Sequence, residues 1–91
     1  MTDIVNNPAQ NRFELVVDGH LAAAYYKRDG NVITFDHTEV APELGGRGVG
    51  SKLVQGALDQ VRASGWKVVA ECPFVKGWIG KHPAYQDLLK S

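Results

Sequence analysis

The sequence predicts an α/β fold of the mixed α+β kind, with an antiparallel meander of three strands followed by a βαβ unit. Three observations indicate it. Residues 12–40 consist of short alternating or β-branched runs that are separated by turn residues such as Asp-Gly. Residues 49–61 repeat apolar side chains at helical spacing, along one face of a helix. Residues 66–71 form a short apolar run that is typical of a buried parallel strand.

The strands of the meander are bounded by turn signals. Residues 1–11 are rich in asparagine and contain a proline, so we expect a flexible lead-in and then a single domain over residues 12–91. Apolar residues alternate from Phe13 to Val17, and the hairpin signal Asp18-Gly19 follows them. The expected strands cover residues 12–17, 20–28 and 32–40.

The second half of the chain contains the helical segments. The central helix should begin near Val49 and end at Ser64-Gly65, where glycine permits a left-handed C-cap. Pro73 suits the first position of a further helix with Cys72 as its N-cap, and Pro83 should end that helix. A last amphipathic turn or two should pack Tyr85, Leu88 and Leu89. The expected order is β-β-β-α-β-α-α, with a right-handed crossover that makes the fourth strand parallel to the third.

Composition and charge exclude several classes of function. Ten Lys and Arg residues balance ten Asp and Glu residues, which argues against the strongly basic surface of a nucleic-acid-binding module. No apolar run reaches the ~20 residues of a membrane span, and the N-terminus lacks the basic and apolar regions of a secretory signal. The single cysteine, Cys72, suits a reducing compartment. We therefore expect a cytoplasmic protein with neither a nucleic-acid nor a membrane partner.

The stretch before the central helix holds four glycines within six residues: Gly45, Gly46, Gly48 and Gly50. A helix start presents free N–H groups and a positive dipole end, and glycines let a phosphate approach the backbone. A Walker A loop does not fit, because Ser51 precedes Lys52 instead of following it. A dinucleotide fingerprint does not fit either, because it requires glycine at position 51. The alternative to a phosphate site is a flexible strand-to-helix connection.

The stretch from Val40 to Gly50 resembles the coenzyme A pyrophosphate loop of the GNAT N-acetyltransferase superfamily. The superfamily pattern is Arg or Gln, two residues, Gly, any residue, and then Gly or Ala. Gly48-Val49-Gly50 matches the end of this pattern, and Gly45 stands where Arg or Gln is usual. Two later patches, Cys72-Pro73-Phe74-Val75 and His82-Pro83-Ala84-Tyr85, resemble the small stand-alone, YjdJ-like subfamily of single-domain proteins. The resemblance spans about residues 12–90.

The resemblance implies a minimal acetyltransferase fold with acetyl-CoA as cosubstrate, an amine as acceptor and no metal. In the superfamily the two parallel strands diverge, and the pantetheine arm lies between them. Here the N–H of Val40 would polarise the thioester carbonyl, and Arg47 would compensate for the missing side chain at position 45. The implied coenzyme A contacts are Val40, Ala41, Gly45, Gly46, Arg47, Gly48, Val49, Gly50, Ser51, Cys72 and Phe74.

The residues that would carry out the transfer are less narrowly defined. Cys72 at a helix N-cap could accept the acetyl group as a thiolate, but direct attack by the amine is usual in the superfamily and is favoured. Glu39, Glu71 and His37, or a water molecule, are the candidates for the general base. Tyr85 is the candidate acid for the departing thiol.

Other functions remain open at this point. Lys76, Lys81 and His82 could contact the nucleotide phosphate or could be solvated surface residues. A non-catalytic coenzyme A-binding or regulatory module is the main alternative to an enzyme, and a nucleotide-linked redox domain is the third. The shortened fold should leave the acceptor side open, which favours a tolerant or protein-sized acceptor.

Overall fold

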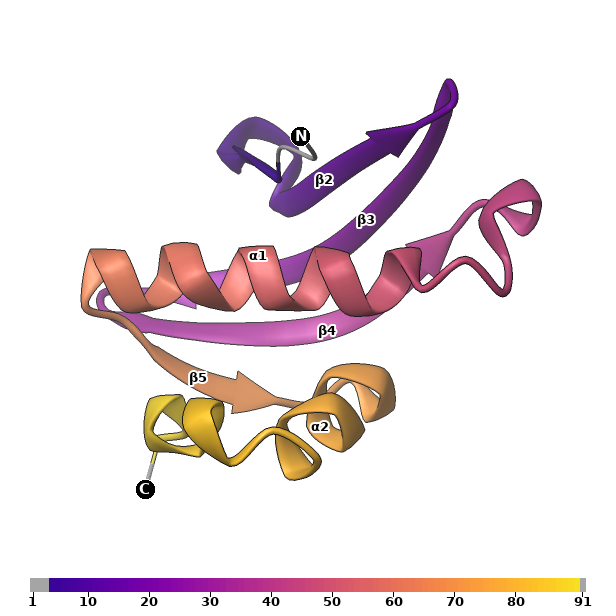
Figure 1. The fold of residues 1–91 in the computed structure, drawn as a ribbon. Helices are drawn as coiled ribbons and strands as arrows, with labels where there is room; N and C mark the ends of the chain where they lie inside the picture. Colours follow the sequence, from indigo (N-terminus) through magenta and orange to yellow (C-terminus); the bar gives the residue numbers. More distant parts are fainter. Residues whose placement is uncertain (1–3, 91) are drawn as a thin grey trace.

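Within the described residues, five strands form one mixed sheet in the order β1-β2-β3-β4-β5 (Figure 1). Their bounds are β1 Val5–Asn7, β2 Arg12–Val17, β3 His20–Asp29, β4 Val32–Val40 and β5 Lys67–Ala70. The pairs β1–β2, β2–β3 and β3–β4 are antiparallel, and β5 runs parallel to β4. This computed structural model describes residues 4–90. It confirms the predicted meander followed by a βαβ unit.

Two α-helices accompany the sheet. Helix α1 (Val49–Ser64) connects β4 to β5 and lies along one face of the sheet, and α2 (Pro73–Gly80) follows β5 (Figure 1). Short 3-10 helices cover Pro8–Gln10, Pro42–Leu44 and Pro83–Leu88. Both helices begin where the sequence predicts, and α1 ends on Gly65 with a φ of 76°. The last predicted helical segment is a 3-10 helix.

The segment before β2 is structured, so the prediction of a flexible lead-in over residues 1–11 is wrong for its described part. Strand β1 pairs antiparallel with β2. The Tyr26 hydroxyl of β3 donates a 2.6 Å hydrogen bond to the side chain of Asn6. Two of the three β1 residues are asparagine, which has low strand propensity, so the strand depends on these cross-strand contacts. Residues 1–3 of the expected lead-in lie outside the described residues.

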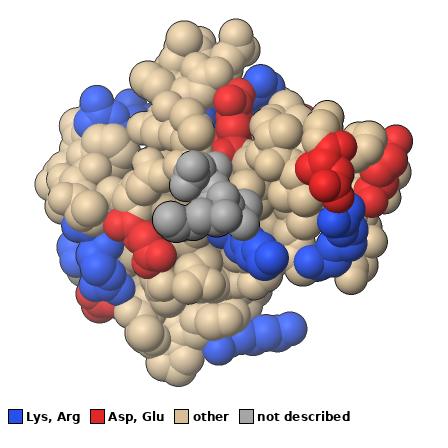
Figure 2. Space-filling view, turned by 45° about the horizontal axis from the view of Figure 1, so that its top comes forward, with Lys and Arg blue, Asp and Glu red and all other residues tan. Residues whose placement is uncertain are grey.

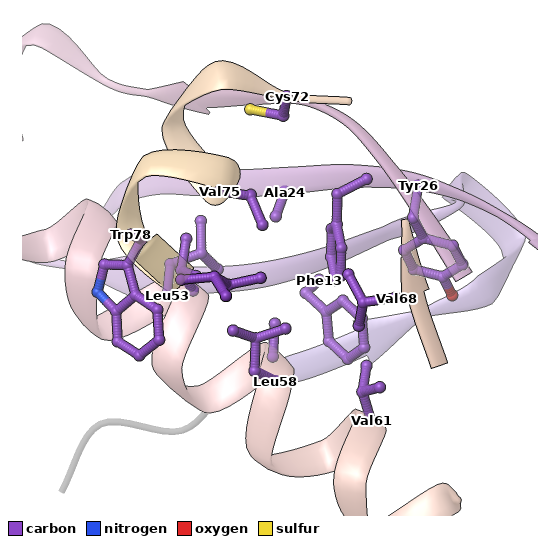
Figure 3. Close-up of a cluster of buried hydrophobic side chains, with 14 of the residues drawn as sticks. Phe13, Ala24, Tyr26, Leu53, Leu58, Val61, Val68, Cys72, Val75 and Trp78 are labelled. Atoms are coloured by element: carbon purple, nitrogen blue, oxygen red, sulfur yellow. The ribbon is translucent and has the colours of Figure 1, made fainter. Parts of the chain in front are cut away.

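The core lies between the sheet and the helices. The buried residues of α1 are the predicted stripe of Val49, Leu53, Val54, Ala57, Leu58 and Val61. Figure 3 shows Leu58 and Val61 beside Phe13 of β2 and Val68 of β5. Gly56 faces Ile4, just before β1, and a Cβ built at position 56 would clash with the side chain of Ile4.

The C-terminal segment lies against the outer edge of β5. Leu89 forms a parallel bridge with Val68, and the N–H of Lys90 donates to the Val68 carbonyl at 2.9 Å. Leu88 is buried as predicted, but Leu89 is 39% exposed, so its predicted packing is wrong. The reason is that Leu89 has extended backbone, in which successive side chains point to opposite faces.

A β-bulge in β4 changes which side chains face α1. Strand β3 pairs with Phe35 and then with His37, which leaves Asp36 as the extra residue between them. Phe35 is buried in the core. Without the bulge, strict alternation of side chains along the strand would place His37 on the same face of the sheet as Phe35. Beyond the bulge, Thr38 and Val40 lie on the helix side and His37 and Glu39 lie on the opposite, solvent-exposed side.

Candidate functional site

Strands β4 and β5 separate part of the way along the sheet. Their last paired residues are Phe35 and Ala70. The N–H groups of Glu71 and Cys72 both donate to the Phe35 carbonyl, at 3.1 and 2.9 Å, and the chain then turns into α2. Strand β4 continues to Val40 without a β5 partner. The two parallel strands therefore leave an opening beyond the bulge.

The backbone of Val40 faces this opening. The N–H of Ala41 donates to the Leu21 carbonyl at 3.1 Å, so residues 41 and 21 form a hydrogen-bonded pair of the β3–β4 ladder. Hydrogen-bonded and non-hydrogen-bonded pairs alternate in an antiparallel ladder. The preceding pair, Ala22 and Val40, is therefore of the non-hydrogen-bonded kind. The N–H and C=O of Val40 consequently point away from β3, toward the edge that β5 leaves uncovered.

The glycine-rich loop reaches α1 through left-handed backbone. Gly46 and Gly48 have φ values of 76° and 71°, which side-chain-bearing residues rarely adopt. Gly48 is the N-cap of α1, and no side chain caps the helix. The first bond of the helix runs from the N–H of Lys52 to the Gly48 carbonyl. In the described part of the chain, the amides of residues 49–51 have no hydrogen-bond partner, as expected for a first helical turn.

Residues 49–51 line a groove of about 320 Å³ at the end of β4. Its walls include Val40, Gly45, Gly46, residues 48–51 and Phe74, all of which the sequence predicts to contact coenzyme A. Phe74 comes from α2, and a Cβ at Gly50 would lie only 2.9 Å from its ring. A side chain at position 50 would therefore have to displace the ring of Phe74, which is exposed.

A second hollow of about 410 Å³ adjoins this groove. It shares Ser51 and Phe74 with the first and extends along α2 to Lys81. The rings of Trp78 and His82 stack with 3.7 Å between their centroids. The indole N–H of Trp78 donates a 2.8 Å hydrogen bond to the Ser51 hydroxyl. The sequence does not indicate this bond, because no residue spacing relates a side chain of α1 to one of α2.

Three predicted contact residues do not line either hollow. Ala41 lies just before the loop, packed against the core. The guanidinium of Arg47 is turned to the β2–β3 hairpin, where it pairs with Asp18 at 2.7 Å. Cys72 is buried, with its sulfur 3.4 Å from the hydroxyl of Thr38 (Figure 3 shows its place at the start of α2).

The catalytic candidates lie in three different places. The Tyr85 hydroxyl donates to Asp59 at 2.8 Å, and that carboxylate raises the pKa of Tyr85. Asp59 is ten residues beyond the start of α1, or about 15 Å along the helix axis, so this hydroxyl lies far from the loop. In this structure the hydroxyl of Tyr85 is bonded to the side of α1, and its role as the acid stays a prediction.

Glu39 lies on the other side of the sheet, where its carboxylate is 3.1 Å from Nε2 of His37. The His37 ring stacks on Tyr25 with 4.4 Å between centroids. The bulge at Asp36 is what turns this pair away from α1. Glu71, the third candidate for the general base, is exposed and lies directly after β5. The imidazole and carboxylate are thus adjacent on the uncovered face of the strand that borders the opening.

Charged side chains of both signs lie on the face shown in Figure 2. On the face shown in Figure 2, basic and acidic side chains alternate and neither forms one continuous patch. Over residues 4–90, no group of three His, Cys, Asp or Glu side chains is placed to hold a metal ion. No helix in the same range combines the length and the apolar character that crossing a membrane requires.

Comparison with known proteins agrees with the fold. Residues 12–88 match the family model described as GCN5-related N-acetyl-transferase. The NMR solution structure of a GCN5-like candidate N-acetyltransferase from Staphylococcus aureus is 36% identical, with a TM-score of 0.74. That similarity covers 98% of this chain and 88% of the other. No curated protein matches the chain significantly. The chain therefore belongs to the GCN5-related N-acetyltransferase family.

Proposed function

We propose that the protein binds acetyl-CoA and transfers the acetyl group to an amine. The observation that carries this proposal is the position of the groove. Residues 49–51, whose amides have no hydrogen-bond partner within the described residues, line it together with Val40. A helix N-terminus attracts the negative charge of a diphosphate, and an extended amide-rich arm can bond to a strand edge. Family membership supports the acetyltransferase activity itself.

The residues present fit coenzyme A in three parts. Backbone amides of Gly46 and residues 48–51 would hold the diphosphate, and the backbone of Val40 would hold the pantetheine arm. The second hollow, with Trp78, Lys81 and His82, would take the nucleotide. When bound, acetyl-CoA supplies a reactive thioester. The Val40 N–H would donate to its carbonyl oxygen, where negative charge develops during transfer.

We propose His37 as the general base, with Glu39 orienting its ring. The 3.1 Å contact between Nε2 and the carboxylate, and the stacking on Tyr25, hold the imidazole in one orientation. His37→Asn should lower kcat about 100-fold, in the range general-base catalysis contributes. Glu39→Gln, which keeps a hydrogen-bond acceptor, should have a smaller effect. Unchanged kcat in His37→Asn would assign proton removal to water.

Direct attack by the amine fits the placement of Cys72 better than a covalent intermediate does. The thiol is only 3% exposed and lies against Thr38, so an acceptor cannot easily reach an acetylated sulfur. Cys72→Ala should keep most of its turnover and its coenzyme A affinity. Abolished turnover with unchanged affinity, or a protein-bound acetyl group on Cys72, would overturn direct attack.

The acceptor is proposed to be an amine on a large or loosely held molecule. The side of β4 that carries His37 and Glu39 is solvent-exposed, and α1 and α2 contribute their buried residues to the opposite side. We also propose that residues 12–91, together with β1, act as one domain. We further propose that the chain is of the small stand-alone subfamily and that it works in the cytoplasm.

The deciding experiment measures binding and transfer separately. Isothermal calorimetry with coenzyme A should give a saturable signal in the wild type. Incubation with acetyl-CoA and a panel of amines and lysine peptides should release free thiol. Binding without thiol release would favour a non-catalytic coenzyme A-binding module, and absence of binding at millimolar coenzyme A would reject both.

A further inference from the structure

We infer that Trp78 is a positioning residue that directs the Ser51 hydroxyl toward the diphosphate of coenzyme A. The inference rests on the proposed function and adds one side-chain contact to its backbone amides. Ser51 is the third residue of α1 and lines both the groove and the second hollow. Its hydroxyl therefore lies at the junction where the diphosphate would pass from pantetheine to nucleotide.

The indole holds its place independently of any ligand. Trp78 is 7% exposed, and its ring is stacked on His82 and meets Tyr85 edge-on. The Nε1–Oγ distance of 2.8 Å to Ser51 is that of a well-formed hydrogen bond. Because the ring is fixed by packing, the donor direction is fixed as well.

The chemistry of the two groups decides what remains free. An indole N–H can only donate, whereas a hydroxyl has one hydrogen and two acceptor lone pairs. Trp78 occupies one lone pair of Ser51 and leaves the hydroxyl hydrogen available. A hydroxyl that accepts one bond becomes a better donor for the next. Diphosphate oxygens are acceptors only, and the unpaired amides of residues 49 and 50 lie in the same turn.

A purely structural role is the competing explanation, because a buried indole N–H needs a partner in any case. In that role, loss of the bond would change stability and leave ligand recognition unaffected. The two explanations therefore differ in what coenzyme A does to the bond, and in whether the effects of changing Ser51 and Trp78 on affinity are independent.

The test uses conservative variants and calorimetry with coenzyme A. Ser51→Ala should weaken binding about tenfold, as loss of one hydrogen bond to a charged group does. Trp78→Phe keeps the ring but removes the donor, and we expect a loss of severalfold. The double variant should bind no more weakly than Ser51→Ala. Trp66→Phe is the matched control, because Trp66 lies just before β5 with the guanidinium of Arg28 over its ring. This variant should bind coenzyme A with the affinity of the wild type.

A second ligand and a spectroscopic signal separate the outcomes. The variants should lose affinity for 3′-dephospho-CoA, which keeps the diphosphate, by the same factors as for coenzyme A. Affinity losses with coenzyme A but not with 3′-dephospho-CoA would overturn the inference. In ¹⁵N spectra, the indole signal of Trp78 should shift on titration with inorganic diphosphate, which has no nucleotide to lie against the ring, in the wild type but not in Ser51→Ala. Wild-type binding with unchanged affinity in Ser51→Ala would overturn this inference and leave the proposed function intact. Absence of wild-type binding would overturn both.

Discussion

Replacing Gly48 by alanine should lower the free energy of unfolding by about 1–2 kcal/mol, the cost of placing an L-residue in left-handed backbone. Gly48 has a φ of 71° as the N-cap of α1. A Cβ built there meets no atom within 4 Å, so neither a clash nor a new contact alters this value. The predicted loss therefore comes from the backbone conformation alone.

Gly77→Ala is the matched control, because its Cβ would also meet no atom within 4 Å but its backbone is helical. Alanine there should stabilise the protein by up to about 1 kcal/mol through helix propensity. Urea denaturation and thermal unfolding of both variants measure the difference, and 1 kcal/mol corresponds to about 4–8 °C in Tm for a domain of this size. If Gly48→Ala unfolds at the wild-type temperature or above it, the assignment of left-handed backbone at the helix start is wrong.

Three further predictions concern the surface and the core. Asp18→Asn removes the ion pair with Arg47 and leaves an Asn-Gly sequence, which suits the hairpin turn. Because both side chains are about half exposed or more, the free energy of unfolding in urea should change by less than about 1 kcal/mol. A larger loss would contradict this prediction. The guanidinium of Arg62 donates to Asp87 and holds the pKa of that carboxyl below its ordinary value of 3.8, so stability present above that pH should be lost as the pH falls through the lower, folded-state value. Asp87→Asn should remove this part of the acid dependence in pH-resolved melts, and an unaltered pH profile would show that the pair contributes nothing. Leu53→Ala deletes a fully buried side chain and should cost about 2–5 kcal/mol in equilibrium unfolding; a cost below 1 kcal/mol would mean that the core collapses around the site.

Local elements were predictable because their signals lie within a few residues. The apolar stripe from Val49 to Val61 depends on a helical repeat of 3.6 residues, and burial of that stripe follows it. Pro73 at the first turn of α2 and Gly65 at the end of α1 act through their own backbone restrictions. The family resemblance rested on the same kind of local pattern, and the comparisons confirm it at the level of the family.

Only the part of the candidate site that consists of backbone was predictable from the sequence. Gly45, Gly46 and residues 48–51 line the groove as expected, since glycine content and a helix start are visible in sequence. Side-chain directions were not predictable. The guanidinium of Arg47 pairs with Asp18 in the β2–β3 hairpin, and the Tyr85 hydroxyl donates to the Asp59 carboxylate. Both depend on partners that are 26 or more residues away.

The amino-acid order by itself determined where each main strand and helix begins and that a glycine loop meets the N-terminus of α1, because periodicity, proline and glycine act locally. Tertiary structure decided the rest. Strand β1 depends on pairing with β2 and on the bond from Tyr26 of β3 to Asn6, and the bulge at Asp36 turns His37 and Glu39 to the uncovered face. Long-range hydrogen bonds and packing determine such features, and no short stretch of sequence encodes them.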